Sequence, residues 1–286
     1  MKIINTLINS NIYIALAALC LAIETQIQLN CKPQFHPYLI LIFFATLIEY
    51  NFNRFVTLLT YKKSLPTQDF QRRYRKYKRF YALITFSILG FTLAVLLANV
   101  YVLLTLIPIA CITVLYSLPQ FKSKWNKLNL RQIPYIKIFL IAFVWSAVTI
   151  LLPVVKQHTA INQPTIWFML LERFLFVFAI TIPFDIRDME ADKQSNLKTI
   201  PLHLGKGKAL AISISSLGCF MVLTTIHYVV SGQTYILIPL LISAMSTIVF
   251  LLVEKLKSTK YYYYGILDGA LLLQAVLVII AGVWFH

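Results

Sequence analysis

The sequence predicts an all-α, polytopic membrane protein with about nine transmembrane helices in a single domain, residues 1–286. Two observations carry this prediction. The 286-residue chain is 59% hydrophobic and only 13% charged, which is too little charge for a soluble domain of this length. Apolar runs near 20 residues recur along the whole chain, each long enough to cross a hydrocarbon core of about 30 Å.

Nine apolar stretches are the candidate membrane helices, and most are apolar on every face, as lipid-embedded helices are. In chain order they cover residues 4–23, 37–59, 80–98, 100–117, 135–154, 165–184, 209–230, 234–252 and 262–285. The first stretch lacks a small-residue cleavage site, so we expect a membrane helix there and not a cleaved signal peptide. The connection 24–36, which contains Glu24, Lys32 and Pro33, is predicted to be a short outer loop.

The net charge of +16 is distributed as a membrane topology requires. Lys and Arg gather in the loops after the second, fourth, sixth and eighth predicted helices, whereas the opposite face keeps little beyond Lys32 and Lys156. By the positive-inside rule the N-terminus is cytoplasmic, in a multi-pass protein of the cell inner membrane. The basic face, including the run 72–79, therefore meets anionic membrane lipids and not nucleic acid.

One stretch, residues 183–193, departs from this basic pattern. It holds four of the ten acidic residues within eight positions, namely Asp185, Asp188, Glu190 and Asp192. The three aspartates stand at i, i+3 and i+7, which places them on one face of a helix. Clustered carboxylates repel one another unless a cation lies among them, and hard oxygen ligands suit magnesium. We therefore predict a Mg²⁺ site on the three aspartates, with Arg187 and Lys193 beside it for a phosphate.

The second predicted helix is polar near its cytosolic end, where it carries Glu49, Asn51, Asn53 and Arg54. Polar side chains inside a membrane are costly, and they usually face a bundle interior or a water-filled cavity. Two interpretations stay open for this cluster: a Glu–Arg pair satisfied within the bundle, or a substrate-binding group. Glu49 and Asn53 are four residues apart and share a face.

Two further helices carry isolated polar groups. Glu172 and Arg173 lie near the middle of the sixth helix, and neighbours in sequence do not face each other on a helix. We therefore expect each of them to pair with a neighbouring helix. Asp268, about two turns into the last helix, is a candidate for a polar cavity.

The acidic stretch carries a resemblance to a known family. Asp185-x-Arg187-Asp188-x-x-x-Asp192, followed by Lys198-Thr199-Ile200-Pro201 and Gly205, resembles the second Asp-rich motif of the UbiA superfamily of intramembrane prenyltransferases. Tyr116-Ser117-x-Pro119 is similar to the family's stretch after the fourth helix. The resemblance implies a helical bundle around a central cavity open toward the cytosolic side. It also implies magnesium-assisted transfer of a prenyl group from an isoprenoid diphosphate to a lipophilic acceptor, aromatic or quinone-precursor-like.

The chain departs from the family pattern in its first motif. The family has Asn-Asp-x-x-Asp-x-x-x-Asp there, whereas this sequence reads Tyr50-Asn51-Phe52-Asn53-Arg54, with the aspartates missing. We therefore expect one magnesium ion, with Arg54 supplying the charge of an absent second metal and Asn51 a hydrogen bond. The remaining residues expected to bind substrate are Tyr116, Lys122, Arg187, Lys193 and Lys198.

Other classes of function compete with this interpretation. A non-catalytic UbiA-like protein that binds an isoprenoid or a quinone is favoured by the missing first motif and disfavoured by the second. A transporter would use the carboxylates for ions, but the paired broken helices typical of that class are not evident in the sequence. A CDP-alcohol phosphotransferase would need Asp-Gly-x-x-Ala-Arg, whereas Asp268-Gly269 leads into Ala270-Leu271-Leu272-Leu273.

Overall fold

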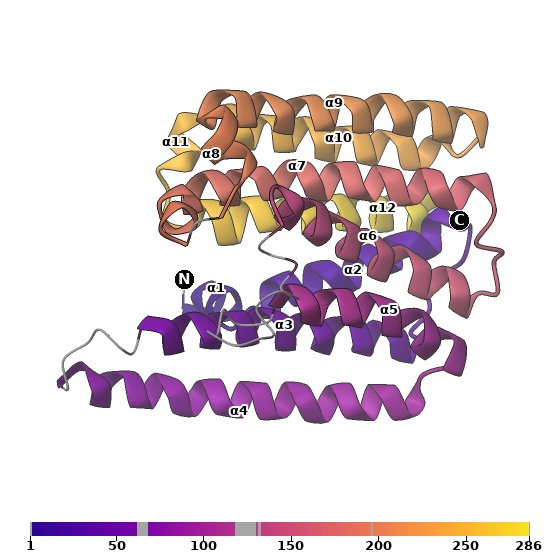
Figure 1. The fold of residues 1–286 in the computed structure, drawn as a ribbon. Helices are drawn as coiled ribbons and strands as arrows, with labels where there is room; N and C mark the ends of the chain where they lie inside the picture. The colour runs from indigo at the N-terminus through magenta and orange to yellow at the C-terminus, as the bar shows by residue number, and fades with distance from the viewer. Residues whose placement is uncertain (1, 62–67, 118–129, 131–132, 196, 286) are drawn as a thin grey trace.

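The computed structural model describes residues 2–61, 68–117, 130, 133–195 and 197–285, and every regular element in them is helical. In chain order these are α1 (Lys2–Asn9), α2 (Ile12–Gln28), α3 (Pro37–Tyr61), α4 (Gln68–Leu97), α5 (Val100–Ser117), α6 (Ile136–Lys156), α7 (Pro164–Gln194), α8 (Ile200–Leu204), α9 (Lys206–Val230), α10 (Thr234–Leu252), α11 (Glu254–Lys257), the π-helical turn η4 (Tyr262–Leu267) and α12 (Asp268–Phe285). The long helices lie side by side along one direction (Figure 1).

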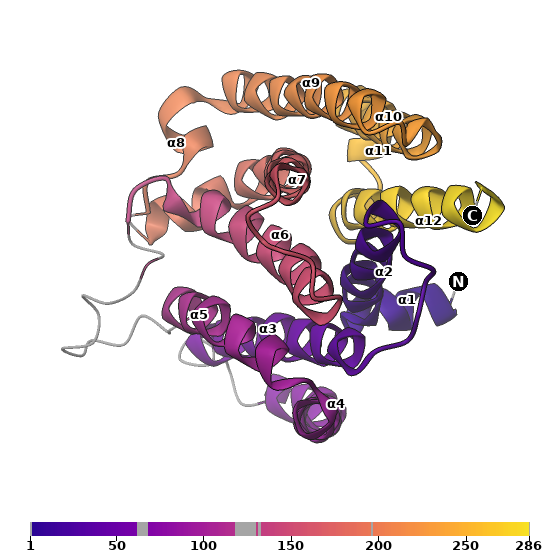
Figure 2. The ribbon, with the colours of Figure 1, turned by 90° about the vertical axis from the view of Figure 1, so that its right-hand side faces the viewer.

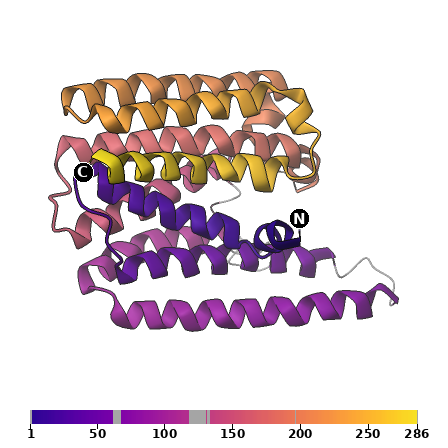
Figure 3. The same cartoon turned by 180° about the vertical axis from the view of Figure 1, so that it is seen from behind.

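Two helices, α2 and α6, lie in the middle of the bundle (Figure 2). On one side α6 packs on α7, α7 on α9, α9 on α10, α10 on α12, and α12 returns to α2. Figure 3 shows the last of these contacts from behind, with α12 between α10 and α2. On the other side lie α3, α4 and α5. Each side has its own apolar core, and Trp145 of α6 packs against both.

Length and composition make this a multi-pass membrane protein. Among the described residues, seven helices are long and apolar enough to cross a membrane. Their outward faces are strongly apolar: Leu89 and Leu96 on α4 are 65% and 77% exposed, and Val230 at the end of α9 is 82% exposed. Such large exposed apolar surfaces are unusual for soluble proteins and are expected where lipid covers the helices. The predicted all-α, polytopic class is therefore confirmed.

The N-terminal region differs from the single helix predicted over residues 4–23. The chain breaks between α1 and α2 at Asn11, which has a left-handed backbone with φ of 61°. Asparagine tolerates this conformation better than most residues, and its side-chain amide donates to Asn51 Oδ1 at 3.1 Å. Helix α2 then continues to Gln28, so the assignment of Glu24 to an outer loop was wrong. Glu24 is fully buried within α2.

Two other helices are longer than their apolar runs. Helix α7 reaches Gln194, ten residues past the predicted end at 184, so the acidic stretch is helical. Helix α4 begins at Gln68, so one helix joins the basic run 72–79 to the apolar segment that follows. In both cases the helix continues into the polar region because a helix satisfies its own backbone hydrogen bonds in water as well as in lipid.

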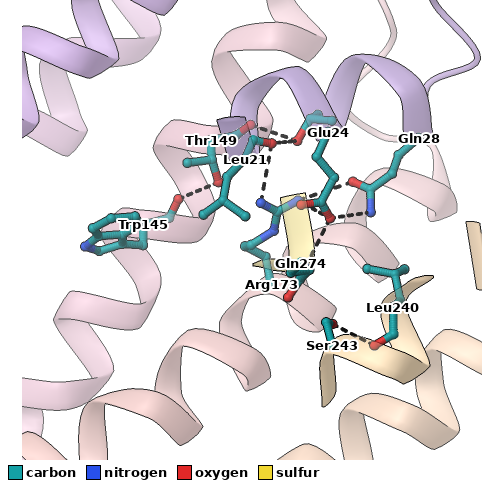
Figure 4. Close-up of polar contacts among 10 residues, drawn as sticks. Leu21, Glu24, Gln28, Trp145, Thr149, Arg173, Leu240, Ser243 and Gln274 are labelled. Carbon is teal, nitrogen blue, oxygen red and sulfur yellow. Dashed lines mark hydrogen bonds and ion pairs between the residues drawn. The ribbon is translucent and has the colours of Figure 1, made fainter. Parts of the chain in front are cut away.

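A network of buried polar side chains joins α2, α7 and α12 within the bundle (Figure 4). Arg173 of α7 pairs with Glu24 of α2 at 3.0 Å, and Gln274 of α12 donates to the same Glu24 oxygen at 3.0 Å. The neighbouring Glu172 instead contacts His227 Nδ1 of α9 at 2.8 Å. The prediction that Glu172 and Arg173 each pair with a neighbouring helix is therefore confirmed.

Replacement of Arg173 by Met should destabilise the protein strongly. The variant leaves Glu24 buried without its cationic partner, and breaking one side of a buried ion pair typically costs about 3–5 kcal/mol. Thermal unfolding in detergent measures the loss. The double variant Arg173→Met, Glu24→Gln should recover part of it, because both charges are gone.

The matched control is Glu254→Gln, which removes an ion pair with Lys257 from a side chain that is 83% exposed. Exposed pairs contribute little to stability, so this variant should unfold like the wild type. Arg173→Met unfolding at the wild-type temperature would contradict the assigned role of the network.

Candidate active site

The last turns of α7 carry the three aspartates, and two of them share one cation. Lys137, in the first turn of α6, places its Nζ 2.7 Å from Asp185 Oδ1 and 3.1 Å from Asp192 Oδ2. The side chains are 12% exposed for Lys137, 2% for Asp185 and 4% for Asp192. Removing three charges from water is favourable only when they compensate one another. The lysine thus holds together two carboxylates that would otherwise repel.

The start of α6 is fixed by the segment that follows α7. Tyr135 has a positive φ of 64° and its backbone N–H donates to the carbonyl of Lys198 at 2.8 Å. The same segment is tied back to α7, because the Leu197 N–H donates to the Asp192 carbonyl at 2.9 Å. These backbone bonds place Lys137 opposite the acidic face. Tyr116, at the end of α5, lies within electrostatic range of Lys137.

Asp188 has a different partner, the adjacent Arg187. Arg187 donates from Nε to Asp188 Oδ1 at 2.6 Å and from Nη2 to Oδ2 at 2.9 Å. Three aromatic rings surround the guanidinium, with centroids at 5.1 Å for Phe184, 4.9 Å for Tyr263 and 5.1 Å for Tyr264. Cation–π attraction and the two-point contact orient the guanidinium as a rigid, charged surface.

The rings on η4 come from a widened helical turn. Residues 262–267 form a π-helix, which often marks a functional position inside a longer helix. Tyr13 of α2 supports this turn by donating its hydroxyl to the Gly265 carbonyl at 3.2 Å. Asp268 follows directly, is 8% exposed and interacts electrostatically with Arg187. That Asp268 belongs to a polar cavity stays a prediction.

The polar cluster on α3 lies elsewhere. Asn51 is buried and donates to the carbonyls of Leu47 at 2.8 Å and Ser10 at 3.2 Å. Arg54 donates to the Asn9 carbonyl at 2.6 Å. Among the described residues, neither side chain has a hydrogen bond or ion pair with the aspartates of α7. Both instead support the break between α1 and α2.

Glu49 on the same helix does not form the Glu–Arg pair that was one of the two interpretations. Its carboxylate accepts hydrogen bonds from Asn53 at 2.7 Å and from Ser117 of α5. Asn53 and Glu49 therefore share a face, as their spacing predicts. The contact with Ser117 ties α3 to the end of α5 beside Tyr116.

The other predicted phosphate ligands are two exposed lysines and one undescribed residue. Lys193 and Lys198 are exposed. The backbone carbonyl of Lys198 accepts the hydrogen bond from Tyr135 that fixes the start of α6. Lys122 lies outside the described residues.

Sequence reasoning missed Lys137, which forms ion pairs with both Asp185 and Asp192. A lone lysine in the first turn of an apolar helix has no motif spacing. One sequence signal for it was available. A charged side chain at the start of an apolar helix, here Ile-Lys-Ile-Phe-Leu, is unfavourable in the membrane unless a partner in the bundle compensates its charge.

Magnesium fits the donor chemistry of this site. Within the part of the chain that the structure describes, no three His, Cys, Asp or Glu side chains converge as a complete ligand set. Magnesium does not need such a set, since it typically takes one or two carboxylates and completes its shell with water and phosphate oxygens. Asp185 and Asp192, held side by side by Lys137, supply two hard oxygen ligands on one face of α7.

The architecture and the acidic face together define a multi-pass helical membrane protein with paired carboxylates and cations at one end of its bundle. The profile of the UbiA prenyltransferase family matches residues 71–261, two thirds of the chain, and the chain belongs to this family. No curated protein matches the sequence.

Two solved structures share the fold. One is of a digeranylgeranylglyceryl phosphate synthase, at 18% identity and a TM-score of 0.55, covering 99% of this chain and 98% of the other. The second is the apo form of a UbiA homologue from Aeropyrum pernix, at 16% identity and a TM-score of 0.60, covering 95% and 97%. At these identities the likeness establishes the fold over nearly the full length. The predicted family is confirmed.

Replacement of Lys137 by Met should lower the unfolding temperature and make it respond to magnesium. Without the ammonium, Asp185 and Asp192 repel each other in a buried place, and a divalent cation can take over the compensating charge. Thermal unfolding with and without millimolar magnesium measures both effects. The magnesium-induced rise should be larger in the variant than in the wild type.

The control is Lys193→Met, because Lys193 is exposed one position after Asp192. It should match the wild type in both measurements. Equal unfolding temperatures and equal magnesium responses for Lys137→Met and wild type would show that the lysine does not bridge the aspartates.

Proposed function

We propose that this protein transfers a prenyl group from an isoprenoid diphosphate to a lipophilic acceptor, with diphosphate as the leaving group. Membership in the UbiA family supports prenyl transfer in general. The observation that carries the finer proposal is the pair of buried aspartates bridged by Lys137, with Asp188 and Arg187 beside them. This arrangement concentrates hard oxygen ligands and fixed cations at one end of a membrane bundle, as diphosphate binding requires.

We propose a different role in diphosphate binding for each group of side chains. Asp185, Asp188 and Asp192 are the proposed magnesium ligands, and the metal would neutralise the charge that develops on the departing diphosphate. Lys137 acts as a positioning residue, because it keeps two of the carboxylates parallel. Arg187, anchored by its aromatic rings, presents a guanidinium to phosphate oxygens. Lys193, Lys198, Lys122 and Tyr116 remain proposed substrate contacts at the rim.

The degenerate first motif changes the charge balance of the site. The region keeps Asn51 but lacks the family's aspartates, and it carries Arg54 nearby. We propose that one metal suffices, because Lys137 supplies a built-in positive charge at the aspartates. Arg54 and Asn51 remain proposed contacts on the α3 side. The chain would therefore bind diphosphate with one metal fewer than the two-motif pattern implies.

The acceptor is proposed to be aromatic or quinone-precursor-like. A lipophilic acceptor reaches the site from the membrane, and an allylic cation formed on diphosphate departure is shielded by aromatic rings and by exclusion of water. We further propose that the aspartate end faces the cytosol in a cell inner membrane, with the N-terminus on the same side. The basic loops of the sequence support this orientation.

The direct test is prenyl transfer by the purified protein. A series of isoprenoid diphosphates of increasing chain length is supplied with magnesium and extracted membrane lipids, and prenylated products are identified by mass spectrometry. Asp188→Ala should lower the rate by roughly 10²–10³-fold, the usual loss when one charge-stabilising group is removed. Glu190→Gln should leave the rate unchanged, because Glu190 is exposed and lies outside the predicted ligand face. Equal rates for Asp188→Ala and wild type would refute the proposed metal site.

A non-catalytic isoprenoid-binding or quinone-binding role is the second candidate. It is favoured by the contacts of Asn51 and Arg54, which hold the α1–α2 break in place and make no contact with the aspartates among the described residues. Under this role the wild type binds the isoprenoid diphosphate but forms no product with any acceptor in the extract. Product formation excludes it.

Arg54→Ala tests the proposed contact on the α3 side. If Arg54 binds a phosphate oxygen, the variant should bind inorganic diphosphate about tenfold more weakly, which corresponds to about 1.4 kcal/mol. Isothermal titration in detergent with magnesium gives the affinity. Lys257→Gln is the control, since Lys257 pairs with Glu254 within the short helix α11. Unchanged affinity in Arg54→Ala would remove Arg54 from the site.

A further inference from the structure

A cavity of about 320 Å³ lies at the end of the bundle opposite the aspartates. Its lining comes from four helices and their connections, and comprises His36, Pro37, Tyr38, Leu97, Ala98, Asn99, Val102 and Lys156. Lys156 ends α6, the helix that begins beside Lys137. With a rise of 1.5 Å per residue this helix is about 30 Å long, so the cavity and the aspartates lie at opposite membrane surfaces. The proposed prenyl-transfer site does not use it.

The cavity contains basic groups without acidic partners. Within the described residues neither Lys156 nor His36 forms an ion pair. The sequence has no Asp or Glu in any connection at this end, namely residues 29–36, 98–99, 157–163 and 231–233. Among the described residues, the charge of Lys156 is therefore available to an anionic ligand.

Two helices also begin at this cavity. Helix α3 starts at Pro37 and α5 at Val100, and both have their first residues in or next to the lining. Helix N-termini carry partial positive charge and free backbone N–H groups. Asn99 uses its side-chain oxygen to accept from the Tyr101 N–H at 2.9 Å, which leaves its amide N–H₂ group as a donor. The positive charge of Lys156 and the N-terminal dipoles of α3 and α5 therefore favour an anion in this cavity.

The wall beside Lys156 is held rigidly. The His36 ring stacks on Tyr38 with centroids 5.6 Å apart, and the Tyr38 hydroxyl contacts the fully buried Gln26. Gln26 also clamps the preceding loop, because it donates to the Gln34 carbonyl at 2.9 Å and accepts from the Gln34 N–H at 2.7 Å. Burial and the nearby Lys156 lower the pKa of His36, so at neutral pH the imidazole is a neutral hydrogen-bonding group and Lys156 supplies the charge.

The rest of the cavity is apolar and continuous with the lipid-facing surface. Leu97, Ala98 and Val102 line it, and the neighbouring Leu96, Val100 and Tyr101 are 77%, 59% and 58% exposed on the outside of α4 and α5. A ligand for this place needs an anionic head and an apolar tail that can lie along these helices. A free inorganic anion has only the first of these parts.

We propose that this cavity binds an anionic phospholipid, with its headgroup phosphate between Lys156 and Asn99 and an acyl chain along α4 and α5. A basic side chain near the membrane surface attracts an anionic lipid, and the clamped loop and the apolar floor add specificity. The lipid comes from the leaflet at the end opposite the aspartates. Its site is separate from the proposed prenyl-transfer site, so it stands whether or not the chain is an active transferase.

The experiment is thermal unfolding of the full-length protein in detergent with added phosphatidylglycerol, phosphatidylcholine or inorganic phosphate. Phosphatidylglycerol should raise the unfolding temperature of the wild type, and Lys156→Gln should lose at least half of that rise. Lys32→Gln is the matched control, because Lys32 is an exposed lysine of the same end that does not line the cavity. It should respond like the wild type.

Native mass spectrometry supplies a second measurement that does not depend on variant stability. The wild type and Lys32→Gln should retain a bound phosphatidylglycerol at detergent concentrations where Lys156→Gln has lost it. Equal retention by all three proteins, or equal responses to phosphatidylcholine and phosphatidylglycerol, would overturn the proposal. A rise produced by inorganic phosphate alone would also overturn it, because the site would then bind a free anion.

Discussion

One ammonium group, shared by two carboxylates inside a membrane protein, is the constraint on which the aspartate end of the bundle depends. Charges buried at this depth are stable only as a compensated set, so Lys137 must lie where Asp185 and Asp192 can both reach it. This requirement sets the position of α6 against α7. It also explains why Tyr135 adopts a left-handed backbone and why the segment after α7 bonds to the start of α6.

The fold class and most helix positions were predictable, because long apolar runs leave membrane helices as the main possibility. Helix ends were less predictable. The break at Asn11 depends on a hydrogen bond to Asn51, forty residues away in sequence. Glu24 was placed outside its helix because a carboxylate in a membrane is unfavourable until Arg173 is known to face it. Such contacts between distant residues have no local sequence signal.

In the candidate site, too, local features were predictable from the sequence and contacts between distant residues were not. The spacing of Asp185, Asp188 and Asp192 predicted a shared helical face, since that property is local to one helix. Lys137 could not be assigned from spacing, because its role arises from the packing of α6 on α7. The expectation for Arg54 rested on a motif comparison, and the structure instead gives it a contact with Asn9. Motifs thus located the acidic half of the site, and packing supplied the basic half.

The widened turn at residues 262–267 has a consequence for how the last helix could vary. A π-helical turn holds one residue more than the α-helical turn it replaces. Deleting one tyrosine there would relax the turn to ordinary α-helix and leave the packing of α12 on α2 and α10 in register. The guanidinium of Arg187 would then lose its contact with one of the surrounding aromatic rings. The extra residue therefore serves the aromatic contacts of Arg187 and not the packing of the bundle.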